Sequence, residues 1–306
     1  MDNLGHKGLL SGNIMRALLY YDLFDYPLTS EEIFRFLPSN HVTHSDIEHE
    51  LDTMVKRARV FKLGDFFSLQ PDPALQARRV NGNELAAKHL KIASAKAKVI
   101  SRFPFVRSVM VSGSLSKGYA DAKSDIDFFV ITHPGRIWIT RSLLGLYRRI
   151  VYFNSRRYFC INYFIDEDHL EIEERNLFTA TELTTLIPLF GLTIHHELML
   201  RNDWAKDYYP NYQLQPVERE GKAEPLFKRL AEQLMNTCFP EVVNRMLMRV
   251  ALHRWKRIYG HTLGADDFRL AFKSGRSVSK SHPNAYQKKV LALFEERVRL
   301  LVNSDA

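Results

Sequence analysis

The sequence is poor in cysteine. Its 306 residues contain two cysteines, Cys160 and Cys238, which lie far apart in the chain. Two distant cysteines exclude a disulfide framework and a zinc site built on paired cysteines. We interpret both as ordinary buried thiols, and we expect a reducing, cytoplasmic compartment.

Long apolar runs are also missing. No stretch approaches the roughly 20 apolar residues that a membrane-spanning helix needs, and the opening residues MDNLGHKGLL do not have the pattern of a signal peptide. Without such segments, we expect no membrane partner. We see no internal repeat and no low-complexity segment. A hydrophobic content of 45% and a charged content of 25% predict an ordinary globular protein of two or three domains.

The positive charge is unevenly distributed. The formal net charge is +8, and the segment 221–306 holds 16 of the 43 Lys and Arg residues but only 8 of the 35 Asp and Glu residues. The whole excess therefore lies in the last part of the chain. Such an excess favours a polyanionic ligand, either a triphosphate or a nucleic acid. The alternative is a solvated basic helical surface.

The most informative stretch is 109–132, which reads VMVSGSLSKGYADAKSDIDFFVIT. It predicts a strand, a turn at Gly113 and Ser114, and a second strand that carries Asp125 and Asp127. Alternate residues of a strand share a face, so we expect these two carboxylates to point the same way. Two carboxylates on an apolar strand need a cation, and oxygen ligands suit Mg²⁺ or Mn²⁺. The glycine lets backbone amides approach a phosphate.

These residues resemble the signature of the nucleotidyltransferases of the DNA polymerase beta type. The family has a hydrophobic strand, Gly-Ser, a spacer that often contains a glycine, and an Asp-hydrophobic-Asp triplet. This chain has Gly113-Ser114, Gly118 and Asp125-Ile126-Asp127, and the resemblance covers residues 106–165. It implies an α/β (α+β) fold with a mixed sheet, a bound NTP, two Mg²⁺ ions held by the aspartates, and release of pyrophosphate.

The same resemblance implies a third carboxylate on the next strand, expected over 158–165. The matching position is Asn162, which can coordinate a metal through its amide oxygen but cannot take a proton. Asp166 has the same strand parity and is a candidate metal ligand, with Glu171 or Glu173 as further candidates. Either the third carboxylate is displaced, or two aspartates suffice, or the activity is reduced.

The remaining segments predict a multidomain arrangement. Residues 1–72 contain three helical patterns and a hairpin signal at Gly64-Asp65, an order that is typical of a winged helix. The third helix is acidic, which disfavours DNA binding and favours a packing or protein-interaction role. We expect a connecting helix over 73–103, a nucleotidyltransferase core over 104–210 and a basic helical domain over 211–306.

A loop rich in serine and basic residues, 272–283, lies in the last of these segments. Related enzymes with an added helical domain hold the triphosphate with Lys and Ser from that domain. The resemblance thus implies Lys273, Ser277 and Lys280 as nucleotide-binding residues, alongside Gly113 and Ser114. The alternative is that this segment is a solvated loop with no role in nucleotide binding.

Three functions remain open from the sequence. The first is a metal-dependent nucleotidyltransferase with Asp125, Asp127 and Asn162 as catalytic residues, acting on an NTP and an unidentified acceptor. The second is a catalytically weakened nucleotide-binding or regulatory protein on the same fold, because Asn162 departs from the family pattern. The third and less favoured function is nucleic-acid binding through the basic C-terminal segment.

Overall fold

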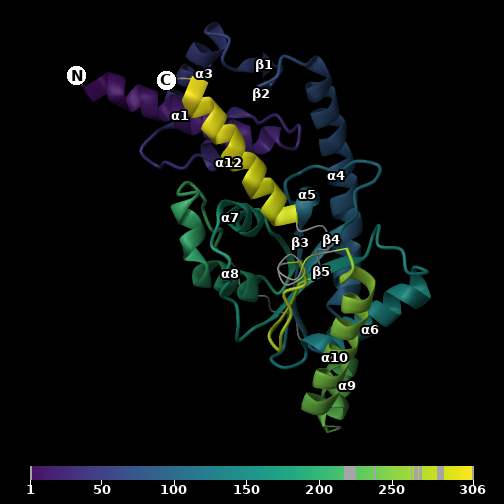
Figure 1. Ribbon diagram of the computed structural model, residues 1–306. Helices are drawn as coiled ribbons and strands as arrows, with labels where there is room; N and C mark the ends of the chain where they lie inside the picture. The colour runs from purple at the N-terminus through teal and green to yellow at the C-terminus, as the bar shows by residue number, and fades with distance from the viewer. Residues whose placement is uncertain are drawn as a thin grey trace.

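The chain folds around a five-stranded mixed sheet with helices on both faces (Figure 1), which confirms the expected mixed α/β class. The structure is a computed structural model that describes residues 2–216, 225–237, 239–262, 264, 268, 271–280 and 286–304; residues 2–8, 302 and 304 are described by their backbone alone. Cys238 and the loop residues 281–283 lie outside this description. No helix in the described ranges is long and apolar enough to cross a membrane.

The sheet has the order β6-β3-β4-β5-β7. Its strands are β3 (Val106–Ser112), β4 (Asp127–Thr132), β5 (Cys160–Asp166), β6 (Ile187–Phe190) and β7 (Val278–Lys280). β4 and β5 are parallel, and the other neighbours are antiparallel. Parallel neighbours need a crossover connection, and helix α6 (Ile137–Val151) provides it.

Alternate residues of the central strands divide between two hydrophobic cores. Val109, Val111, Phe128 and Val130 belong to the core formed with α4 (Pro73–Ile100), α6 and α10 (Pro240–Tyr259). Met110, Phe129 and Ile131 belong to the core formed with α7 (Leu177–Thr184) and α8 (Leu192–Arg201). Because both faces are covered, the strands read as continuous apolar runs rather than alternating ones.

The N-terminal segment has the expected order of three helices and a hairpin. The elements are α1 (Asp2–Asp22), α2 (Ser30–Arg35), α3 (His44–Lys56), β1 (Phe61–Leu63) and β2 (Phe66–Ser68). A bridge between Leu28 and Phe67 extends the hairpin, and Thr29 and Thr43 cap α2 and α3 with capping boxes. Its assignment as a winged helix remains a prediction.

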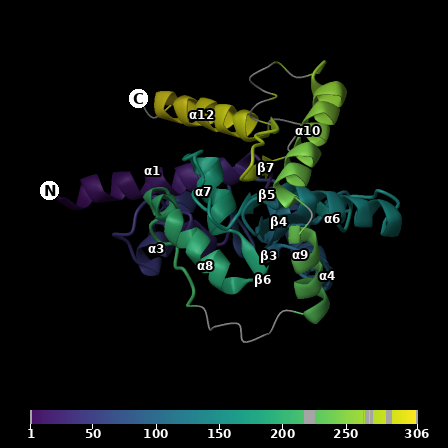
Figure 2. The same cartoon turned by 90° about the horizontal axis from the view of Figure 1, so that it is seen from below.

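This N-terminal segment does not have a core of its own. Its buried residues form one cluster with Ala180 of α7, Ala205 of η1 (Asp203–Asp207), Tyr209, and Val290 and Phe294 of α12 (Tyr286–Ser304). Figures 1 and 2 show α12 lying beside α1. The first and last helices of the chain are therefore packed together on one side of the sheet.

A buried arginine joins the N-terminal segment to α4. Arg79 is 3% exposed and contacts Glu32 with its guanidinium at 2.6 Å. It also donates to the Pro27 carbonyl at 2.8 Å and lies over the Tyr26 ring. A buried charge with this many partners fixes the position of the N-terminal segment relative to the connecting helix.

The structure corrects two expectations. The elements of 211–306 are distributed over the molecule: α9 (Leu226–Thr237) and α10 pack on the sheet domain, β7 joins the sheet, and α12 packs on α1. This does not match a separate basic helical domain. Strand β6 lies between α7 and α8 and tolerates Pro188 because it is an edge strand. The loop expected over 272–283 contains strand β7. Helix α4 (Pro73–Ile100) lies where the connecting helix was expected.

Candidate active site

The turn after β3 requires a glycine. Gly113 has a φ of +69°, a backbone conformation that residues with a side chain rarely adopt. A Cβ at this position would lie 2.7 Å from Oδ2 of Asp127. The turn opens the short helix α5 (Gly113–Ser116), and Ser112 pairs with Asp127 across the β3–β4 ladder. The fold therefore holds the Gly-Ser turn directly against the second aspartate.

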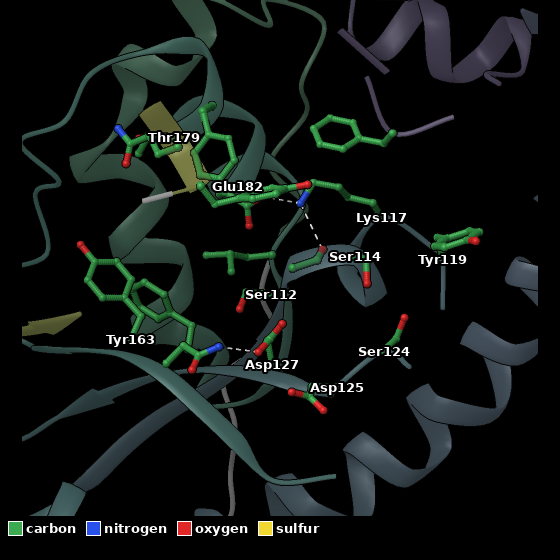
Figure 3. Close-up of a pocket in the computed structure, with 18 of the residues that line it drawn as sticks. Ser112, Ser114, Lys117, Tyr119, Ser124, Asp125, Asp127, Tyr163, Thr179 and Glu182 are labelled. Carbon is green, nitrogen blue, oxygen red and sulfur yellow. Dashed lines mark hydrogen bonds and ion pairs between the residues drawn. The ribbon is translucent and has the colours of Figure 1, made fainter. Parts of the chain in front are cut away.

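The two aspartates line the same cavity (Figure 3), but only one lies in a strand. Asp127 is the first residue of β4, and Asp125 lies in the preceding loop, so the expected strand begins later than the sequence indicates. Burial raises the pKa of Asp127 to about 7, and the negative charge of Asp125 acts in the same direction. An ionised Asp127 is thus costly in the folded protein unless a cation is bound.

Asn162 of β5 contacts Asp127. Its amide Nδ2 donates to Asp127 Oδ1 at 2.5 Å, and its Oδ1 accepts from the Cys160 thiol at 3.2 Å. Burial raises the pKa of Cys160 to about 12, and the nearby aspartates add to this rise, so the thiol remains a protonated donor. Asn162 is therefore a neutral neighbour of Asp127 with both ends of its amide in use.

The cavity beside these residues has a volume of about 790 Å³, within the range of sites for small organic ligands. One wall is the sheet edge, with the Gly-Ser turn, both aspartates, Asn162 and Lys280. The opposite walls come from the N-terminal segment, α7 and the start of α12, and include Tyr20, Phe24, Tyr26, Phe178, Glu182 and Tyr286. Elements far apart in sequence thus enclose one site, and several of its walls are aromatic.

Two lysines reach into this cavity. Lys117 Nζ contacts Glu182 Oε1 at 2.7 Å and donates to the Gly113 carbonyl at 3.1 Å. Lys280 donates to Gln287 Oε1 at 3.0 Å, and its burial lowers its pKa. The Lys117 ammonium group therefore lies where an anionic ligand beside the Gly-Ser turn would meet it, and Lys280 lines the same cavity from β7.

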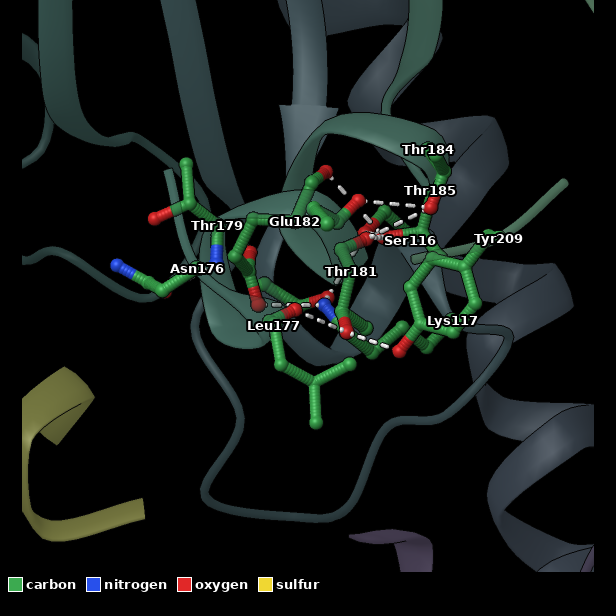
Figure 4. Close-up of polar contacts among 12 residues, drawn as sticks. Ser116, Lys117, Asn176, Leu177, Thr179, Thr181, Glu182, Thr184, Thr185 and Tyr209 are labelled. Carbon is green, nitrogen blue, oxygen red and sulfur yellow. Dashed lines mark hydrogen bonds and ion pairs between the residues drawn. The ribbon is translucent and has the colours of Figure 1, made fainter. Parts of the chain in front are cut away.

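Helix α7 is held by a network of hydroxyl groups (Figure 4). Asn176 caps its N-terminus by accepting from the Thr179 amide. Thr181 and the Tyr209 hydroxyl lie 2.7 Å apart, and Thr185 donates to the Thr181 carbonyl at 2.7 Å. Ser116 of the Gly-Ser turn donates to the Gly113 carbonyl and contacts Thr185 Oγ1. The network joins α7 to the turn that follows β3.

Three residues predicted for the site lie elsewhere. Asp166 pairs with Thr132 at the opposite end of the β4–β5 ladder from Asp127, four residues or about 13 Å along β5 from Asn162. Its carboxylate instead contacts His169 at 2.6 Å. The register between β4 and β5 also shifts between Ile161 and Tyr163, so strand parity did not indicate the face of Asp166 or the end of the strand at which it lies.

Lys273 and Ser277 are also outside the residues that line the cavity. Lys273 forms ion pairs with Glu173 and Glu174 at 2.7 and 3.0 Å. The Ser277 carbonyl accepts from the Asp166 amide. Of the three residues taken from the C-terminal loop, the structure brings only Lys280 to the cavity, because β7 pairs with β5.

Lys117 and Glu182 were not predicted as site residues from the sequence. Lys117 lies four residues after Gly113, so its place in the spacer of the motif was an available signal. Glu182 had no such signal. It lies on a helix whose position over the cavity depends on contacts with η1, α12 and the N-terminal segment.

The donors at the site suit a hard divalent cation. The carboxylates of Asp125 and Asp127 offer oxygen ligands, and the raised pKa of Asp127 would fall if a cation bound there. Across the described ranges, no three His, Cys, Asp or Glu side chains gather into a metal-binding group. A cation held by two carboxylates needs further oxygen ligands, which phosphate groups or water provide.

Comparison with protein-family models matches residues 92–178 to the nucleotidyltransferase domain. The matched stretch runs from the second half of α4 through β3, the Gly-Ser turn, β4, α6 and β5 to the start of α7. No curated protein and no solved structure gave a significant match. The segment that holds Gly113, Asp125, Asp127 and Asn162 is therefore similar to a nucleotidyltransferase domain, and this similarity supports nucleotidyl transfer as a general function.

Proposed function

We propose that this protein is a metal-dependent nucleotidyltransferase that moves a nucleoside monophosphate from an NTP to an acceptor. The observation that carries the proposal is the packing of Gly113 against Asp127. The glycine leaves no room for a side chain beside the carboxylate, and the two aspartates face one cavity. A phosphate-binding turn in contact with paired carboxylates is suited to phosphoryl transfer on metal ions.

The nucleotide is expected to enter with its phosphates toward the sheet edge. Gly113 and Ser114 would face the β and γ phosphates, and Lys117 and Lys280 would offset their charge. The aromatic walls contributed by α1, α7 and α12 offer apolar surfaces for a base or for the acceptor. Since the N-terminal segment and α12 cover this side of the sheet, the reacting groups would be shielded from bulk water.

Asp125 and Asp127 would hold the divalent cation, Mg²⁺ or Mn²⁺. When bound, such a cation offsets the charge on the phosphoryl oxygens and fixes the triphosphate for in-line attack. Asn162 would keep the Asp127 carboxylate oriented through its amide hydrogen bond. The acceptor attacks the α phosphorus, and pyrophosphate leaves.

Transfer assays with labelled NTPs test this proposal. We expect Mn²⁺-dependent pyrophosphate release, with water or an added acceptor as nucleophile, and mass spectrometry would report any residue of the protein that becomes labelled. Asp125→Asn and Asp127→Asn should each lower the rate by at least about a hundredfold. Glu197→Gln on α8, which breaks an exposed pair with Arg201, is the matched control and should react like the wild type. Unchanged release in either aspartate variant would refute the proposal.

A second candidate function follows from Asn162. Because this amide cannot take a proton, a nucleotide-binding protein with little or no transfer activity is the alternative. It predicts tight binding of an NTP with Mg²⁺ in calorimetry and no transfer to any acceptor in a panel of small molecules, proteins and RNA. Measurable transfer above the Asp127→Asn background excludes it.

A further inference from the structure

The cavity contains a carboxylate on α7 that the nucleotidyltransferase motif does not include. Glu182 lines the cavity opposite the sheet edge and faces Lys117 (Figure 3). Its side chain is 29% exposed and contacts Lys117 at 2.7 Å, and Lys117 also donates to the carbonyl of Gly113, which packs against Asp127. Glu182 therefore lies on the same cavity as the aspartates and is accessible enough to reach a ligand.

We propose that Glu182 accepts the proton of the attacking acceptor, and that Lys117 holds this carboxylate until the phosphates of the incoming nucleotide bind the lysine. The inference rests on the proposed function. It assigns the missing carboxylate of the site to α7 instead of β5, and it makes the release of Glu182 depend on nucleotide binding.

The other carboxylates of the cavity have different partners or roles. The carboxylates that line it within the described ranges are Asp25, Asp121, Asp125, Asp127, Glu174 and Glu182. Asp125 and Asp127 form the expected cation pair. Asp25 is paired with Arg78, Asp121 accepts from Ser124, and Glu174 is paired with Lys273. Lys273 does not line the cavity, and Arg78 lines it while donating to the Phe24 and Asp25 carbonyls. The partner of Glu182, Lys117, instead contacts the Gly113 carbonyl, where the phosphates are expected.

Lys117 is positioned to exchange partners. It directly follows α5, and its ammonium group is within 3.1 Å of the Gly113 carbonyl and 2.7 Å of Glu182. A triphosphate beside the Gly-Ser turn brings oxygens with greater negative charge than one carboxylate to the same ammonium group. The lysine would then turn to the phosphates, and Glu182 would be left as a free base.

Hydrogen bonds hold the helix that carries Glu182, and the proposed exchange is a side-chain rotation. Thr181, Thr184 and Thr185 bond to carbonyl groups within α7, and Ser116 links this helix to the Gly-Ser turn (Figure 4). Rotation of an exposed or half-exposed side chain is fast compared with enzymatic turnover. The helix would therefore present Glu182 at a constant place while its carboxylate changes partner.

In the proposed step, the acceptor attacks the α phosphorus and gives up its proton to Glu182. The acceptor oxygen forms a bond to the α phosphorus, and the bond from that phosphorus to the oxygen bridging to the β phosphate breaks. Pyrophosphate leaves with that electron pair. The proton of the acceptor hydroxyl moves to a carboxylate oxygen of Glu182 and is later released to solvent.

Glu182→Gln separates this role from a structural one. We expect the variant to bind the α,β-methylene analogue of the preferred NTP about tenfold more tightly, because Lys117 no longer has a competing carboxylate. We expect its transfer rate to fall by about a hundredfold or more, because a general base is lost. A purely structural role would weaken both quantities.

Two further variants complete the test. In Lys117→Met/Glu182→Gln the gain in analogue affinity should disappear, and in Asn162→Asp/Glu182→Gln the carboxylate returned to β5 should recover transfer by at least about tenfold. Equal or weaker analogue binding by Glu182→Gln, or transfer at the wild-type rate, would overturn the inference. If the wild type binds the analogue but transfers nothing, the proposed function fails, while the affinity measurements still decide whether Lys117 exchanges partners.

Discussion

Replacing Asp127 by asparagine should stabilise the folded protein at neutral and alkaline pH, although it removes a residue of the proposed active site. Burial holds the pKa of Asp127 at about 7, against an ordinary value of 3.8. Each pKa unit corresponds to about 1.36 kcal/mol, so ionised Asp127 costs the fold up to about 4 kcal/mol above pH 7. Because Asp127 is not completely buried, we expect a gain of about 2 to 4 kcal/mol in Asp127→Asn.

The sign of this effect depends on pH in a defined way. Below pH 4 the carboxyl group is protonated in the folded and the unfolded protein, and the substitution gains nothing. Between about pH 4 and pH 7 the folded protein binds the proton more strongly, so wild-type stability falls as the pH rises. The stability difference should therefore grow across this window and level off above pH 7.

Urea unfolding in metal-free buffer, followed by tryptophan fluorescence between pH 4 and pH 8, measures the difference. Asp121→Asn is a control from the same cavity. Burial alone would raise the pKa of Asp121, but hydrogen bonds from Ser124 and the Lys123 amide lower it, so this variant should gain no stability. Mn²⁺ should stabilise the wild type at pH 8 and leave Asp127→Asn unaffected. An Asp127→Asn protein no more stable than the wild type at pH 8, or a gap independent of pH, would refute the reasoning.

Three other substitutions test the packing around the site. Gly113→Ala should cost about 1 to 3 kcal/mol in urea unfolding and lower nucleotide affinity in calorimetry, because the backbone is left-handed and a Cβ has no room. Arg79→Met should cost about 3 to 5 kcal/mol, since it leaves Glu32 without its buried partner, and should speed proteolysis of the N-terminal segment. Gly82→Ala would put a Cβ 2.3 Å from the Tyr119 ring; we expect a several-fold rise in KM with little change in kcat.

The sequence pattern was sufficient to predict the candidate site residues that lie close to one another in the chain. Gly113, Ser114, Asp125 and Asp127 lie within fifteen residues of one another in one strand-turn-strand unit, and the structure brings all four to one cavity. Asn162 could be placed beside them because a parallel strand follows through a single crossover helix. The roles assigned to these residues remain predictions that the assays above test.

The sequence pattern predicted wrong site residues where the position of a side chain depends on contacts with distant parts of the chain. Asp166 was predicted from strand parity, but the strand register shifts beside Asn162 and Asp166 lies at the far end of β5. Lys273 and Ser277 shared a loop with Lys280, yet only Lys280 reaches the cavity, because the pairing of β7 with β5 sets which residues face it. The aspartates were also expected on one strand, whereas β4 begins at Asp127.

The amino-acid sequence by itself determined the order of most elements and the presence of the Gly-Ser and Asp-Ile-Asp motif, since both depend on propensities, capping residues and spacing within about twenty residues. Only the tertiary structure decided what surrounds that motif. Glu182 and the aromatic walls reach the cavity because α1, α7 and α12 share one hydrophobic core, and Lys280 reaches it because β7 pairs with β5. Burial of apolar surface drives that packing without regard to sequence distance, so no local pattern indicates which side chains it brings together.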